Sequence, residues 1–179
     1  MNTRLPVIRT LTAAETAAAQ TVFADSLDYA AVRIRSGFPV LPLSAACAPR
    51  GRIYFPQRHC SADFACGSDA QILWLIHELT HVWQWQNGYK PWLGGLILAV
   101  QGGYFRRAAY RIPPDAPSLP FAALNMEQQA VAVEQLYIVK NLPHIILPPE
   151  RTFQTALNEF ADNPNNPALL PRYFCRLPA

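Results

Sequence analysis

Residues 72–86 read ILWLIHELTHVWQWQ, an apolar run that contains the pentapeptide HELTH. This pentapeptide matches the HExxH pattern, in which two histidines bind a metal ion and the glutamate holds a water molecule. Residues four apart in an α-helix lie about 40° apart around the axis and about 6 Å apart along it, so His77 and His81 can reach one ion. Half of the histidines of the chain fall in this pentapeptide, which favours a Zn²⁺ site with Glu78 beside it.

Signals at both ends of this run predict one helix over residues 69–86. Ser68 and Gln71 have the spacing of a capping box, and Asn87-Gly88 offers a left-handed exit. Apolar side chains point around nearly the whole circumference, so we expect this helix to be buried on most sides. Buried titratable groups are costly unless they are paired or coordinated, and a zinc ion would compensate them. The alternative interpretation is a buried helix that carries its polar residues by chance.

Length and composition predict one compact domain that spans residues 1–179. Hydrophobic residues make up 51% of the chain and charged residues 15%, which is typical of a folded domain and not of a disordered segment. The formal net charge is only +3 and no Lys/Arg-rich run is present, which argues against nucleic-acid binding. Arg106-Arg107 is interpreted as a solvated corner.

The sequence indicates neither a Sec-type signal nor a membrane-spanning segment. Glu15 and Asp25 interrupt the Ala-rich N-terminal region, which therefore lacks the continuous apolar core of a Sec signal. The most apolar stretch, residues 92–100, is about half as long as a bilayer requires. We expect no membrane span, a cytoplasmic location in the producing cell, and export without a Sec signal if the protein is exported.

The four cysteines, Cys47, Cys60, Cys66 and Cys175, form no CxxC pair, which argues against a zinc ribbon. Free thiols in a reducing compartment are the simplest interpretation. A bridge between Cys60 and Cys66 is the alternative in an oxidising compartment. His59 beside Cys60 is weak evidence for a second metal site.

The remaining segments predict an α+β fold that is mainly helical with a small sheet. Capping signals, glycine pairs and proline breakers predict further helices over residues 12–24, 96–101, 125–139 and 150–161. Two short strands are predicted over residues 29–34 and 52–55. The second strand is expected to form an edge beside the cleft, where an extended substrate could pair with it.

Two histidines leave a zinc ion short of protein ligands, so a third ligand must come from elsewhere. Glu127 and Glu134 lie on one face of the helix predicted over residues 125–139, but about 10 Å apart along its axis, so only one can bind the ion. Glu127 stands beside the predicted cap, where the backbone is held rigid. Its alternative role is to complement the helix dipole. Four other downstream residues have suitable side chains: Asp115, Glu134, His144 and Glu150.

The HELTH segment, followed by a glutamate on a later helix, resembles the gluzincin zinc peptidases, of which the thermolysin group is the familiar member. Residues 76–84 and 125–130 more closely resemble small zinc proteases found with type VI secretion spike (Vgr-related) and polymorphic-toxin proteins. The resemblance covers residues 12–140. The resemblance implies a minimal zincin-like domain. The residues that correspond to the zinc ligands are His77, His81 and Glu127, and the residue that corresponds to the base is Glu78. The 46-residue gap between His81 and Glu127 departs from thermolysin, so its substrate pocket is not transferred.

These observations predict a zinc-dependent endopeptidase that cleaves a protein or peptide substrate, in the setting of a secreted toxin effector with a secretion-apparatus or immunity-protein partner. One alternative is a zinc-containing binding or adaptor module without turnover, and another is an amidase that acts on cell-wall peptide. An intact Glu78 favours the enzymes, because a structural zinc site needs no base. A peptidase also needs a hydrogen-bond donor to the oxyanion that forms on the substrate carbonyl. The sequence offers five candidates for this donor without a choice among them: Tyr104, Tyr110, Arg111, Tyr137 and His144.

Overall fold

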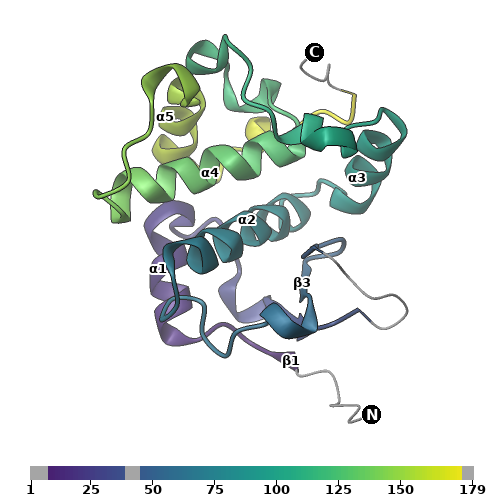
Figure 1. The fold of residues 1–179 in the computed structure, drawn as a ribbon, viewed down its shortest axis with the longest axis vertical. Helices are drawn as coiled ribbons and strands as arrows, with labels where there is room; N and C mark the ends of the chain where they lie inside the picture. The colour runs from purple at the N-terminus through teal and green to yellow at the C-terminus, as the bar shows by residue number, and fades with distance from the viewer. Residues whose placement is uncertain (1–7, 39–44, 175–179) are drawn as a thin grey trace.

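Two long helices, α2 (Asp69–Gln86) and α4 (Met126–Asn141), lie side by side across the middle of the molecule (Figure 1). The structure is a computed structural model, which describes residues 8–38 and 45–174. The other helices are α1 (Ala13–Phe23), α3 (Pro91–Val100) and α5 (Gln154–Asp162). The strands are β1 (Ile8–Arg9), β2 (Arg33–Ser36) and β3 (Arg52–Phe55). The predicted mainly helical α+β fold is confirmed.

The small sheet has the order β1-β2-β3, with β1 antiparallel and β3 parallel to β2. The parallel register pairs Arg33 with Arg52 and Ser36 with Phe55. The strand predicted over residues 52–55 is therefore confirmed. The strand predicted over residues 29–34 is wrong at its start, because a 3₁₀ turn occupies Tyr29–Ala31 before β2 begins.

Three capping boxes predicted from the sequence begin the three longest helices. Glu15 N donates to Thr12 Oγ1 while Thr12 N donates back to Glu15. Ser68 N donates to Gln71 at the start of α2. The cap of α4 is described with the site below. These local contacts satisfy backbone N–H groups that have no partner within a helix, so they set where each helix begins.

Helix α3 differs from the prediction of a short helix over residues 96–101, because it begins five residues earlier, at Pro91. The glycine pair at its predicted start lies inside the helix. A Cβ at Gly94 would overlap the Tyr89 hydroxyl and lie 2.8 Å from Met126 Sδ. Glycine is required here for close packing and not for flexibility.

Helix α5 begins at Gln154 and not at residue 150. A 3₁₀ turn, Pro149–Arg151, takes the place of the predicted first helical turn. Thr152 Oγ1 donates to Pro148 O at 2.8 Å and closes this turn.

Buried apolar side chains from α1, α2, α4 and α5 form the main core. Trp83 lies at its centre, packs edge-on against Phe160 and donates from Nε1 to Pro164 O at 3.0 Å. Within the described part of the chain, no helix is both long enough and apolar enough to cross a membrane.

Three of the four cysteines are described, and Cys47, Cys60 and Cys66 are all free thiols. The alternative bridge between Cys60 and Cys66 is therefore not formed, while Cys175 lies outside the described residues.

Candidate metal centre

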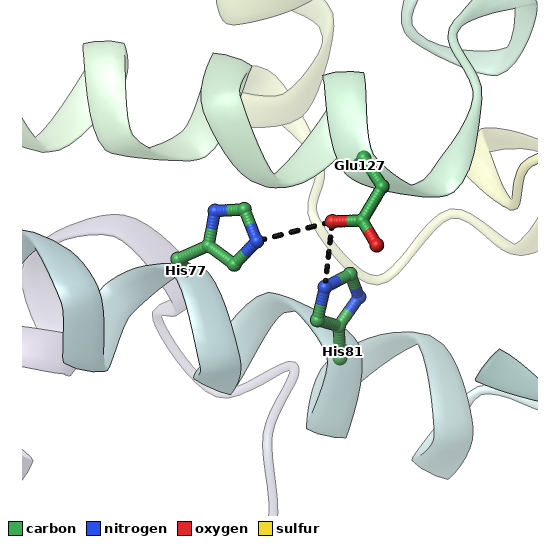
Figure 2. Close-up of side chains that lie close together, drawn as sticks. All are labelled: His77, His81 and Glu127. Carbon is green, nitrogen blue, oxygen red and sulfur yellow. Dashed lines mark hydrogen bonds and ion pairs between the residues drawn. The ribbon is translucent and has the colours of Figure 1, made fainter. Parts of the chain in front are cut away.

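His77, His81 and Glu127 meet where α2 faces the N-terminal end of α4 (Figure 2). One carboxylate oxygen of Glu127 lies 3.2 Å from His77 Nε2 and 3.3 Å from His81 Nε2. The candidate ligand atoms of the three residues all lie within 4.8 Å of one another. The tertiary structure thus brings together the three residues that the sequence predicts as ligands.

The cap of α4 holds Glu127 in place. Asn125 Oδ1 accepts from the backbone N–H groups of Glu127 and Gln128, both at 2.9 Å. Gln128 Oε1 accepts from Asn125 N at 3.1 Å and completes the capping box. These cap hydrogen bonds fix the first turn of α4. Glu127, which is only 4% exposed, therefore faces α2 from a rigid position.

Two further side chains orient the imidazole rings. Glu134 Oε1 lies 2.5 Å from His77 Nδ1, and Gln84 Oε1 lies 2.9 Å from His81 Nδ1. Each acceptor favours a proton on Nδ1, which leaves the Nε2 lone pair for the side that faces Glu127. From the sequence, Glu134 is only an alternative ligand to Glu127. Its spacing of seven residues places it two helical turns farther along the same face of α4, where it contacts the other side of His77.

Gln84 is itself fixed within the core. Its Nε2 donates to Met126 O at 3.1 Å and to Gln129 Oε1 at 3.0 Å. These two bonds leave Oε1 as the group that faces His81. The only signal for Gln84 in the sequence is its position three residues after His81, which places the two on adjacent turns.

Glu78 lies in the wall of the same cavity as His77 and His81. It is 3% exposed, and its Oε2 is buried without a hydrogen-bond partner among the described residues. Burial raises the pKa of Glu78, and the two neighbouring imidazoles only partly offset this. A buried carboxylate oxygen without a donor is costly in a structural role, so this oxygen is suited to accept a proton from a bound group.

The electrostatics of the three candidate ligands are tightly coupled. Burial alone would raise the pKa of Glu127, but the facing imidazoles of His81 and His77 lower it well below the usual range. Burial favours a neutral ring at His77, but hydrogen bonds to Glu127 and Glu134 raise its pKa well above the ordinary value. A cation is therefore stabilised between these groups, as a proton on the imidazoles or as a metal ion.

Two imidazole nitrogens and one carboxylate oxygen form the donor set of many catalytic zinc sites. Both rings keep their second nitrogen on an acceptor, as zinc-binding histidines do. The unpartnered oxygen of Glu78 lies beside the cluster without joining it. The residues present therefore fit a Zn²⁺ ion with an open position.

Two tyrosines complete the surroundings of Glu127. Tyr104 Oη donates to Glu127 Oε1 at 2.9 Å, and the ring of Tyr110 stacks on His77 with centroids 6.0 Å apart. Burial, together with the charge of Glu127, raises the pKa of both hydroxyls. Both therefore stay protonated and act as hydrogen-bond donors near neutral pH.

The structure separates these tyrosines from the other candidate oxyanion donors. Tyr137 lies in the main core, and His144 lies 2.7 Å from Asp69 at the exposed start of α2. Arg111 lines a neighbouring cavity and not the one around Glu78. Tyr104 and Tyr110 are the two candidates that line the cavity containing the cluster.

The alternative third ligands do not join the cluster. Among the described residues the one group with metal-ligand geometry is His77, His81 and Glu127. It does not include Asp115, Glu134, His144 or Glu150. His59 accepts from Arg58 Nε at 3.0 Å and lies against the ring of Trp74, and it belongs to no group with metal-ligand geometry among the described residues.

A cavity of about 300 Å³ opens onto the cluster, with residues 45–49 along one wall. Cys47 N donates to Tyr54 O and Tyr54 N donates to Cys47 O, at 3.1 Å and 2.9 Å. These bonds occupy the free edge of β3 at its middle. The prediction that β3 offers its edge to a substrate is therefore wrong there, since residues 45–49 form that wall instead.

No family model matches this chain. The type VI secretion system spike protein VgrG2b of Pseudomonas aeruginosa is 35% identical over an alignment of 137 residues, which covers 74% of this chain and 13% of that protein. The chain thus spans only a small part of that relative's length. The structure of this chain is also similar to the solved effector domain of Pseudomonas aeruginosa VgrG2b. The TM-score is 0.64 and the sequence identity 27%, over 92% of this chain and 84% of that one. The chain is homologous to that effector domain.

Proposed function

We propose that this chain is a zinc-dependent endopeptidase that acts as an effector of a type VI secretion system. Homology to the VgrG2b effector domain supports the effector role. The cluster of His77, His81 and Glu127 supports a bound metal ion, and we assign it Zn²⁺. The observation that carries the enzymatic part is the buried, unpartnered Oε2 of Glu78 beside this cluster.

His77, His81 and Glu127 would hold the zinc ion, and Glu134 and Gln84 would keep the two rings in the binding tautomer. A zinc ion bound there would supply Lewis acidity to a water molecule and to the carbonyl of the substrate. Glu78 Oε2 accepts the proton of the attacking water and then delivers it to the nitrogen of the leaving amine. The raised pKa of Glu78 makes it a stronger proton acceptor than an exposed carboxylate.

Tyr104 and Tyr110 act as donors to the oxyanion that develops on the substrate carbonyl. Both hydroxyls line the cavity next to Glu127 and remain protonated because their pKa values are raised. Because both hydroxyls interact with Glu127 in this structure, each turns toward the oxyanion when the substrate is bound.

The decisive test is Glu78→Gln, which keeps the shape of the side chain and removes the proton acceptor. The zinc-loaded protein is incubated with an unbiased peptide library, and cleavage is followed by mass spectrometry. We expect loss of the base to reduce turnover by roughly 10²- to 10⁴-fold. Zinc content and Tm should stay unchanged.

Cleavage that survives in Glu78→Gln would contradict the role of the base. If neither protein cleaves any peptide while both bind zinc and arrest a cell that expresses them, the binding-module alternative replaces the peptidase. Digestion of cell-wall peptide by the same preparations separates the amidase alternative, since only that activity would convert the cell-wall peptide and leave the library intact.

A further inference from the structure

A second cavity, of about 430 Å³, adjoins the cluster of His77, His81 and Glu127 and is lined by residues of α2, α4 and the segment 106–112, together with Arg151. It shares three residues with the site already described, namely His77, Tyr110 and Glu134. Its remaining wall is strongly basic, since it contains Arg106, Arg107, Arg111 and Arg151. The four arginines come from two segments far apart in the sequence.

Among the described residues, little negative charge balances Arg106, Arg107 and Arg151. Glu134 is the one carboxylate in the lining, and it is already engaged with His77 Nδ1. Within the described residues, Arg106, Arg107 and Arg151 form no ion pair with a carboxylate. All three are exposed, and Arg107 lies over the ring of Tyr110 with its guanidinium carbon 5.2 Å from the ring centroid.

Helix α4 holds both basic segments through two glutamines. Gln128 Nε2 donates to Arg111 O at 2.9 Å, and Gln135 Nε2 donates to Arg151 O at 2.8 Å. These glutamines are seven residues apart and each follows a glutamate of the site, Glu127 or Glu134. One face of α4 therefore serves the metal cluster while the next positions the arginine segments.

The segment between the two tyrosines has an unusual backbone. Arg106 has φ 49° and ψ 27°, and Arg107 has φ 57° and ψ 33°. Two consecutive side-chain-bearing residues in the left-handed region are strained, and such strain concentrates at functional sites. Here it lets Tyr104 and Tyr110 face Glu127 while both intervening arginines line the second cavity.

We propose that this second cavity is a subsite that binds an acidic side chain, Asp or Glu, of the polypeptide substrate close to the scissile bond. This inference rests on the proposed peptidase function. Guanidinium groups bind carboxylates with two parallel hydrogen bonds, so arginine is well suited to this recognition. Because His77 and Tyr110 line both cavities, the bound residue lies next to the residue that is cleaved.

The shape of the site favours a peptide over a larger polyanion. The basic residues surround a concave cavity and do not form a stripe along the surface, as a nucleic acid would require. Arg106 and Arg107 are exposed, as expected for a solvated corner. Folding adds Arg111 and Arg151 to the same wall, which the sequence does not indicate.

Peptide binding tests the inference without relying on turnover. The zinc-loaded Glu78→Gln protein is titrated by fluorescence with two dansyl-labelled peptides that differ only in Glu or Gln at matched positions. We expect the Glu peptide to bind more tightly, with a preference that weakens as salt is added. Each arginine exchanged, Arg106→Gln or Arg151→Gln, should reduce the preference by about two- to fivefold. Arg151→Glu should favour a matched Lys peptide.

Arg33→Gln is the matched control, because Arg33 lies on β2 and lines neither of the two cavities. It should leave the preference unchanged. Equal binding of the Glu and Gln peptides, or equal loss in Arg33→Gln, would overturn the inference. So would binding to anionic phosphatidylglycerol vesicles that depends on these arginines while the peptides do not differ.

The two proposals fail in different ways. If the wild-type protein cleaves library peptides with no enrichment of Asp or Glu, and the arginine variants cleave the same sites, the subsite is wrong and the peptidase stands. If the acidic peptide binds selectively through the arginines but no peptide is cleaved, the subsite stands as a binding site and the peptidase is wrong.

Discussion

At the scale of single residues, Glu127 and Glu134, seven residues apart on α4, contact different ring nitrogens of His77. Glu127 faces the Nε2 atom on the metal side, and Glu134 faces Nδ1 on the other. The sequence predicts that only one of them can be a ligand, and only Glu127 belongs to the candidate cluster among the described residues. It does not indicate that the other fixes the ring, because that depends on how deeply α4 packs against α2.

We expect about one zinc ion per chain, and we expect substitutions of the ligands to reduce zinc binding more than substitutions of the residues behind them. Glu127→Ala, His77→Ala and His81→Ala remove a ligand and should each abolish zinc retention after dialysis. Glu134→Gln removes only the acceptor behind His77 and should weaken zinc affinity by roughly 10- to 100-fold. Elemental analysis gives the stoichiometry, and competition with a chelating dye gives the affinity. Full zinc retention in Glu127→Ala combined with loss in Glu134→Gln would reverse the assignment.

At the scale of elements, the N-terminal caps do more than begin helices. The cap of α1 supports a helix outside the site, whereas the cap of α4 binds the backbone N–H of Glu127, the proposed third metal ligand. The two caps are chemically similar, so a comparison between them separates stability from site geometry.

Asn125→Ala and Thr12→Ala should each lower the free energy of unfolding by about 0.5 to 2 kcal/mol, the usual cost of a lost cap. Only Asn125→Ala should also weaken zinc binding, because Asn125 Oδ1 orients the first turn that carries Glu127. Urea unfolding of the metal-free proteins gives the first quantity and dye competition the second. Equal zinc affinity in the two variants would show that the α4 cap has no role at the site.

At the scale of the whole molecule, the metal cluster connects the two central helices across the core. The metal-free protein must keep positive charge between Glu127 and the histidines by protonation. Hydrogen bonds to Glu127 and Glu134 outweigh burial and raise the pKa of His77 well above 6.5. The stability of the metal-free fold is therefore linked to pH.

A raised pKa in the folded state adds stability that is complete below pH 6.5 and is lost as pH rises through the raised value. We expect the Tm of the metal-free protein to fall as pH increases above 6.5. Bound zinc replaces the proton, so the gain in Tm from saturating zinc should grow over the same range. Differential scanning fluorimetry with and without zinc measures both. His77→Asn should flatten the metal-free profile, and a metal-free Tm that rises with pH in the unaltered protein would refute the linkage.

Features that depend on neighbours along the chain could be predicted from the amino-acid sequence. The HExxH spacing placed both histidines on one face of α2, and hydrogen bonds over three residues set the starts of α1, α2 and α4. The start of α3 is predicted five residues too late, because the glycine pair is interpreted as a helix boundary. Gly94 instead allows close packing against Tyr89 and Met126, which are not its neighbours in the sequence.

The contacts between segments far apart in the sequence could not be predicted in this way, because they arise from tertiary packing. Packing of α4 on α2 brought Glu127 to both histidines and gave Glu134 its place behind His77. Pairing of Cys47 with Tyr54 put residues 45–49 along the cavity, and α4 brought Arg151 beside Arg107. Local patterns are encoded by fixed geometry over a few residues, whereas these meetings depend on the summed packing of the whole core, which no spacing in the chain records.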